Sequence, residues 1–119
     1  MYEKMYKLDE VLKFFHDELN IKDGDKRITQ LYNMIPNPFV RVNGNDKQWV
    51  AYVSQASEDK TVEDAMKEIL KISDAKWLLG EQKKTKNIID KVGKIFVDKR
   101  IKFKPRIPFY ILVLNELVQ

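Results

Sequence analysis

The chain has 119 residues, of which 44% are hydrophobic and 34% charged, and its 22 lysines and arginines outnumber its 18 acids to give a net charge of +4. One domain over residues 1–119 is expected from this length, and six Phe, five Tyr and two Trp are too many for a disordered tail. The absence of cysteine excludes disulfides, thiolate catalysis and thiolate zinc sites, and it fits a reducing compartment.

Two further patterns bear on where the protein works. Residues 1–5 lack the basic-then-apolar pattern of a signal peptide. The longest apolar run, Phe109 to Leu114, is far shorter than the roughly 20 residues that a membrane span needs. We therefore expect a cytoplasmic protein with no membrane partner.

The N-terminal segment, residues 2–19, is predicted to form an amphipathic helix because its apolar side chains recur at steps of three and four. Asn20 is expected to end this helix before the turn sequence Asp23-Gly24-Asp25. The single histidine, His16, lies on the helix. Without a second histidine or any cysteine to complete a site, it is interpreted as a rim or surface residue.

A second, short helix is expected from Arg27 to Ile35. It must end there, because the ring of Pro36 disfavours helical geometry in the residue before it.

The next two segments, Phe39–Val42 and Gln48–Val53, are rich in β-branched and aromatic residues and flank the turn sequence Asn43-Gly44-Asn45-Asp46. This pattern predicts a β-hairpin. Its aromatic residues, Trp49 and Tyr52, are interpreted as covering the helical core in preference to stacking on nucleic-acid bases.

Three helices are predicted after a polar connector over residues 54–60. Thr61 is the expected N-cap of the first, which ends near Ile72. A short helix follows over residues 75–79, and a third covers residues 85–96. Gly93 lies inside the third helix at a cost of about 1 kcal/mol relative to alanine.

The C-terminal part of the chain begins with alternation from Val97 to Lys104, which predicts a short strand with a basic outer face. The run Phe109–Leu117 fits a buried strand by composition. A helix with Pro108 as its first residue also fits, because the missing N–H is tolerated there, and the helix is slightly favoured.

Taken together, these elements predict an α+β fold that is mostly helical with one β-hairpin. From Thr61 to Lys104 the order is helix, short helix, turn, basic helix, basic strand. That order resembles a helix-turn-helix followed by a wing, as in winged-helix domains.

Positive charge is concentrated between residues 82 and 106, where ten cations face only Asp90 and Asp98 for a net charge of +8. The remainder has twelve cations against sixteen acids, a net charge of −4. This polarity predicts a polyanionic partner. Because lysines outnumber arginines here, phosphate contact is favoured over base reading. The predicted contact residues are Lys83, Lys84, Lys86, Asn87, Lys91, Lys94, Lys99, Arg100, Lys102, Lys104 and Arg106.

The function predicted from this pattern is that of a small non-catalytic nucleic-acid-binding protein with a regulatory role, DNA being favoured over RNA. No Gly-rich phosphate loop, nucleophile elbow or metal-ligand spacing occurs, so no catalytic residue, metal or cofactor is predicted. The alternative is a protein–protein interaction or inhibitor module that docks on a larger nucleic-acid-handling complex. In that case the same lysines contact an acidic protein surface, or Phe109–Leu114, if the monomer exposes it, forms a homodimer interface.

Overall fold

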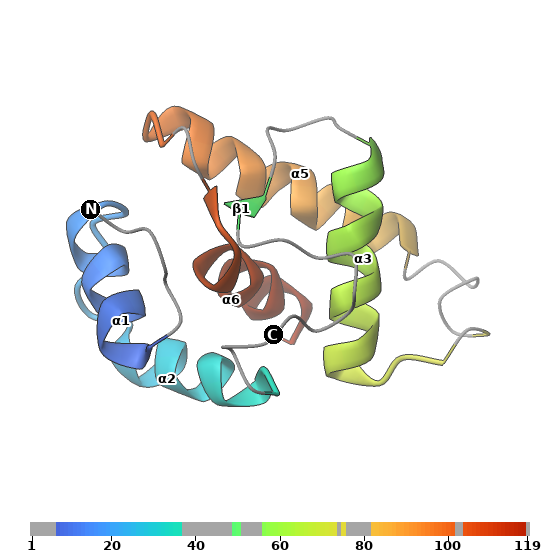
Figure 1. The fold of residues 1–119 in the computed structure, drawn as a ribbon, viewed down its shortest axis with the longest axis horizontal. Helices are drawn as coiled ribbons and strands as arrows, with labels where there is room; N and C mark the ends of the chain where they lie inside the picture. Colours follow the sequence, from blue (N-terminus) through green and yellow to red (C-terminus); the bar gives the residue numbers. More distant parts are fainter. Residues whose placement is uncertain are drawn as a thin grey trace.

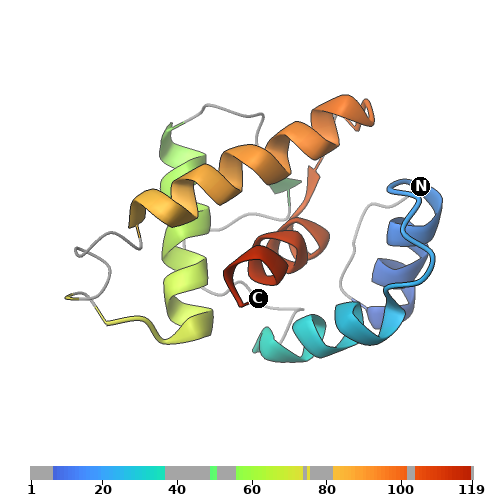
Figure 2. The same ribbon diagram turned by 180° about the vertical axis from the view of Figure 1, so that it is seen from behind.

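The computed structural model describes residues 7–36, 49–50, 56–73, 75, 82–101 and 104–118. In chain order the elements are α1 (Leu8–Asp17), α2 (Asp25–Met34), β1 (Trp49–Val50), α3 (Ala56–Leu70), α5 (Gln82–Asp98), β2 (Lys104–Pro105) and α6 (Arg106–Leu117). Helix α6 lies in the middle, with α1 and α2 on one side, α3 on the opposite side, and α5 running across above it in the view of Figure 1 (Figures 1 and 2). The fold is thus organised around the last of the described helices.

Helix α6 is central because it is apolar around most of its circumference. Eight of its residues are buried, and α1, α2, α3 and α5 all contact it. A helix without a polar face has to be enclosed by others. The helix slightly favoured for the closing run is therefore confirmed, although it begins at Arg106 and not at Pro108. Pro108 is tolerated in the first turn because the N–H groups there have no intrahelical partner.

The hydrophobic core joins helices from both ends of the described chain. The ring of Phe96 on α5 stacks on Phe14 of α1, with centroids 6.2 Å apart, and lies 5.5 Å from the ring of Phe109 on α6. Such aromatic contacts add to the stabilisation from buried area alone. One cluster of buried side chains therefore holds α1, α5 and α6 together.

The first two helices confirm the periodicity argument over the residues that the structure describes. Val11, Phe14 and Phe15 of α1 are buried, as are Ile28 and Leu31 of α2. After α2, Ile35 has an extended backbone with ψ of 118°, as expected for a residue that precedes proline. Residues 2–6 of the predicted first helix lie outside the described residues.

The predicted α+β class with a β-hairpin is wrong, because the described chain is helical. Strands β1 and β2 have two residues each, and they pair antiparallel with Trp49 opposite Pro105 and Val50 opposite Lys104. This short bridge joins segments that are distant in sequence. Strand propensity reports how well a side chain suits a half-buried surface, so it does not determine the partner strand. The predicted strand over residues 39–42, the turn over 43–46 and Tyr52 lie outside the described residues.

The prediction that Thr61 caps the helix after the polar connector is also wrong. Helix α3 begins at Ala56, so residues 56–60 are helical and Thr61 lies inside the helix and does not cap it. The polar residues before Thr61 extend the helix because one apolar stripe, with Val62, Met66 and Ile69 buried, is sufficient to anchor it. Among these polar residues, Lys60 forms an ion pair with Asp64 one turn later, with N and O 3.7 Å apart.

The basic strand predicted from Val97 to Lys104 is replaced by the end of a helix. Val97 and Asp98 belong to α5, and the N–H of Ile101 donates to the carbonyl of Phe96 at 2.9 Å while that of Arg100 donates to the carbonyl of Val97 at 2.9 Å. This is the Schellman pattern, and Arg100 occupies its left-handed position with φ of 60°. The wing that the strand was expected to form is therefore absent from residues 97–101.

Two other residues just after a helix also adopt the left-handed conformation. Asn20 and Lys71 have φ of 57° and 55°, and the residue after each donates its N–H to a carbonyl six positions or five positions earlier, Phe15 for Ile21 and Lys67 for Ile72. Helix α1 itself ends at Asp17, so Asn20, predicted to end the first helix, lies three residues beyond it. Asparagine tolerates the left-handed conformation better than most residues, whereas lysine and arginine adopt it at a cost.

Candidate nucleic-acid interface

Helix α5 has one apolar face, which fixes the direction of its other side chains. Thr85, Ile89, Val92 and Phe96 are buried and recur at steps of three and four residues. Because positions separated in this way lie on one side of a helix, the opposite side faces solvent, while Ile88 and Ile95 at the margins of the buried stripe are half-buried. With 17 residues and roughly 1.5 Å of rise per residue, the helix offers a surface about 25 Å long.

The exposed side of α5 carries most of the residues predicted to contact a polyanion. We call it the lysine face and include in it the turn that follows the helix. Its predicted contact residues, all exposed, are Lys83, Lys84, Lys86, Asn87, Lys91, Lys94, Lys99 and Arg100. The structure therefore brings eight of the eleven predicted residues to the solvent side of one helix and its C-terminal turn.

Carboxylates weaken this surface at a few points. Asp90 and Asp98 lie on α5, so seven cations face two acids between residues 82 and 101. Lys91 Nζ donates to Glu116 Oε1 of α6 at 2.6 Å. Within the described part of the chain, the other six cations of the lysine face form no ion pair with an acidic side chain. The face is therefore a row of solvated positive charges.

The prediction that Arg106 belongs to this surface is wrong. Its side chain is only 2% exposed, and its guanidinium carbon lies 5.8 Å from the centre of the Tyr110 ring. Arg106 begins α6, the enclosed helix, so the packing that buries α6 buries this cation as well. Lys104 lies in β2, where it pairs with Val50, and Lys102 lies outside the described residues.

The helix-turn-helix hypothesis is tested only in part. Helix α3 contacts α5, and Ala75 between them is helical. Residues 76–81, which include the rest of the predicted short helix and its turn, lie outside the described residues. The order of two helices around a connecting segment thus stays a prediction, and the wing is excluded over residues 97–101.

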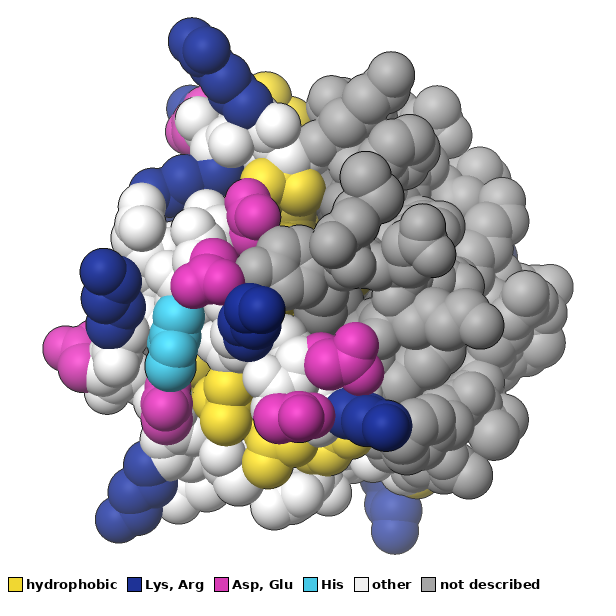
Figure 3. Space-filling view, turned by 60° about the vertical axis from the view of Figure 1, so that its left-hand side comes forward, with side chains coloured by type: hydrophobic (Ala, Val, Ile, Leu, Met, Phe, Trp, Pro, Cys, Tyr) yellow, Lys and Arg dark blue, Asp and Glu magenta, His cyan; other side chains and the backbone are white. Residues whose placement is uncertain are grey.

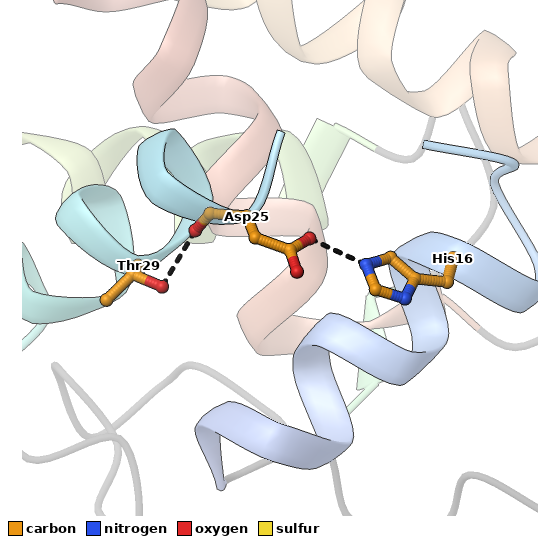
Figure 4. A network of polar contacts seen from close by, with 3 residues as sticks. All are labelled: His16, Asp25 and Thr29. Atoms are coloured by element: carbon orange, nitrogen blue, oxygen red, sulfur yellow. Dashed lines mark hydrogen bonds and ion pairs between the residues drawn. The ribbon is translucent and has the colours of Figure 1, made fainter. Parts of the chain in front are cut away.

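The surface over α1 and α2 has a different character, because acidic and basic side chains are interspersed there around the histidine (Figure 3). His16 Nε2 donates to Asp25 Oδ1 at 2.6 Å, and Thr29 Oγ1 donates to the backbone carbonyl of Asp25 at 2.7 Å (Figure 4). The first contact ties the end of α1 to the first turn of α2, and the second lies within α2. The half-buried His16 is therefore a rim residue, as predicted, with a contact that holds two helices together.

Other kinds of site have little support in the part of the chain that the structure describes. There, His, Asp and Glu side chains form no cluster of three or more that could hold a metal ion.

The pKa of the Tyr32 hydroxyl is raised above its ordinary value, first by burial and then by the nearby charge of Asp9. Among the described helices, none combines the length and the apolar character needed to cross a bilayer.

Sequence reasoning missed the role of Glu116. The sequence offers no signal for its contact with Lys91, because the two residues are 25 positions apart and meet only where α5 packs on α6. Comparisons with protein-family models, with curated proteins and with solved structures found no match.

Proposed function

We propose that this protein is a small, non-catalytic nucleic-acid-binding module of the cytoplasm, which contacts the phosphate backbone of duplex DNA through the lysine face. The observation that carries the proposal is the row of six cations, free of ion pairs with described acids, along a helix about 25 Å long and the turn that follows it. Because α5 is anchored to α3 and α6 by its apolar face, the lysines share a fixed surface. This arrangement suits a partner whose charge is also regularly spaced.

The energy of such binding comes from counterion release. Duplex DNA carries one negative charge per roughly 1.7 Å of axis, so the lysine face spans on the order of fifteen phosphate charges. Each lysine that neutralises a phosphate releases condensed counterions, and the affinity then falls with salt. Lysine is a flexible point charge, so it favours phosphates over bidentate contacts with guanine.

Base reading is proposed to be weak. Asn87 is the only amide among the predicted contact residues, and an amide side chain can pair with the edge of adenine. Asp90 and Asp98 oppose close approach to a polyanion. A regulatory role would therefore come from occupying DNA and not from selecting a sequence.

The second candidate function is a module that binds an acidic protein surface. The ion pair between Lys91 and Glu116 favours it, because it shows that a lysine of this face can accommodate a carboxylate. Exposed pairs of this kind contribute about 0–1 kcal/mol each, so many would be needed for stable binding.

A salt titration of duplex binding tests the proposal. We expect the logarithm of the association constant to fall with log salt at a slope of about −5, since six contacts contribute roughly 0.9 each. Replacing Lys83, Lys86 and Lys94 together by glutamine is expected to reduce this slope by about 3. Fluorescence anisotropy with a labelled duplex from about 50 to 200 mM salt measures both quantities.

The matched control replaces Lys13, Lys22 and Lys26 by glutamine. All three are exposed on or between α1 and α2, so the net charge falls equally while the lysine face stays intact. Equal losses in the two triple variants would show that only total charge matters and would contradict the assignment. Absence of duplex binding at about 50 mM salt would favour the acidic-protein alternative.

A further inference from the structure

A pocket of about 130 Å³ lies between α2, the turn before it and the C-terminal half of α6. Its wall is mainly apolar, with Phe15, Ile21, Ile28, Leu31 and Ile111 among the lining residues. None of its lining residues lies on α5, so it is separate from the lysine face. An apolar wall of this size offers room for a small hydrocarbon group, since a cavity of about 150 Å³ accepts benzene in another protein.

The rim of the pocket is polar and positively charged. Arg27 Nε donates to Asn115 Oδ1 at 3.1 Å, which joins α2 to α6 and holds the guanidinium at the edge of the pocket. This bond uses only one of the guanidinium's five N–H donors. No acidic side chain lines the pocket.

The start of α2 places charges of both signs beside the pocket. Gly24, which lines the pocket, directly precedes α2, and the N-terminus of a helix carries partial positive charge. Asp25, in the first turn of α2, carries the opposite charge, and its carboxylate accepts a hydrogen bond from His16 outside the pocket lining. The pocket therefore combines an apolar interior with one cation on its rim, Arg27.

We propose that this pocket binds a small carboxylic acid with an apolar body, such as a single ring or a short branched chain. The hydrocarbon would fill the space between Ile28 and Ile111, and the carboxylate would accept hydrogen bonds from the terminal nitrogen atoms of Arg27. Arginine and carboxylate form strong, directional pairs of this type. Because the ligand contacts both α2 and α6, its binding stabilises the folded protein.

Benzoate is the probe that tests the site. Titration followed by two-dimensional NMR is expected to give saturable shifts in residues of α2 and α6, with Kd of about 1 mM or tighter for a ligand of this size. The unfolding temperature should rise as benzoate saturates the protein. Benzyl alcohol has a similar shape and no charge, so it should bind at least about tenfold more weakly.

Two single variants separate the rim from general charge effects. Arg27→Met keeps a long apolar stem and removes the guanidinium, so benzoate affinity is expected to fall about tenfold or more while that of benzyl alcohol changes little. Lys26→Met removes the neighbouring exposed cation and should leave both affinities unchanged. The unfolding temperature without ligand checks that each variant is folded.

A third variant tests the interior. In Gly24→Ala the new Cβ would lie 3.2 Å from Ile21 Cγ2 and 3.7 Å from Ile28 Cδ1, and it narrows the pocket without straining the backbone, whose φ is −105°. Benzoate and benzyl alcohol should both bind more weakly to it. The inference is overturned if benzoate up to about 20 mM gives no saturable shifts, or if Arg27→Met binds benzoate like the unaltered protein. DNA binding plays no part in these measurements, so either proposal can fail alone.

Discussion

Helices α5 and α6 follow one another along the described chain and pack together, yet they place positive charge in opposite ways. Lys94 of α5 is exposed, whereas Arg106 of α6 is 2% exposed. Both residues belong to the stretch of sequence with the highest positive charge. The comparison teaches that a cation becomes available to a partner through the position of its helix in the fold, and charge density along the sequence does not determine it.

The largest expected effect contrasts the two faces of α5. Phe96→Ala removes a ring that contacts both Phe14 and Phe109, and we expect a loss of about 3–5 kcal/mol in the free energy of unfolding. The next residue, Val97, is 41% exposed, so Val97→Ala should change the same quantity by less than about 0.5 kcal/mol. Urea unfolding measures both variants. Similar losses in the two would mean that α5 is not rotated as described.

The next effect sets the buried cation against an exposed one. Arg106→Ala should lower the free energy of unfolding by about 2 kcal/mol, because it removes buried packing and the contact with Tyr110, while the salt slope of duplex binding stays unchanged. Lys94→Ala should do the reverse, reducing the slope by about 0.9 with little change in stability. Urea unfolding measures the stability of both variants, and fluorescence anisotropy measures their salt slopes. We expect each variant to change one quantity and leave the other unchanged. A reduced slope in Arg106→Ala would place this residue back in the interface.

A third, smaller effect concerns Arg100, which affects both the stability of the fold and the charge of the lysine face. Arg100 has φ of 60°, a conformation that glycine adopts without strain, so Arg100→Gly should raise the free energy of unfolding by about 1 kcal/mol. The same change removes a cation from the lysine face and should reduce the salt slope by about 0.9. Lys71→Gly, at the equivalent end of α3, is the control: it should stabilise equally and leave the slope unchanged. Stabilisation without loss of slope in Arg100→Gly would remove Arg100 from the interface.

The smallest expected effect concerns the contact between the two helices. Glu116→Gln removes the charge that pairs with Lys91 and should cost about 0.5 kcal/mol, because both side chains reach solvent. Lys91 is then available to a phosphate, so duplex affinity at low salt should rise slightly. Urea unfolding measures the stability of this variant, and fluorescence anisotropy at low salt measures its affinity for duplex DNA. A fall in affinity would indicate that Glu116 itself contacts the partner.

The lysine face could be predicted from the sequence because it depends on one helix alone. The spacing of Ile89, Val92 and Phe96 fixes which side of α5 is buried, and that fixes where its lysines point. Arg106 could not be placed in this way, because its burial depends on helices that are distant in sequence. The pocket at Arg27 was missed for the same reason, since α2 and α6 build it together.

The helix ends show a second reason for the errors. In a sequence, a glycine usually marks the left-handed residue that follows a helix. Lys71 and Arg100 adopt this left-handed conformation without being glycine, so the sequence did not mark these helix ends. The residues after Phe96 therefore looked like an alternating strand. Thr61 was misplaced because a polar segment with a good cap residue can equally be the solvent side of a longer helix.

The central position of α6 has a consequence for synthesis on the ribosome. The other described helices all pack on residues 106–117, which are translated after them. Until that segment has left the exit tunnel, the helices can pair only in part, α1 with α2 and α3 with α5, and the apolar faces that α6 covers stay open. The core of the nascent chain is therefore expected to be completed late, once residues 106–117 have been made.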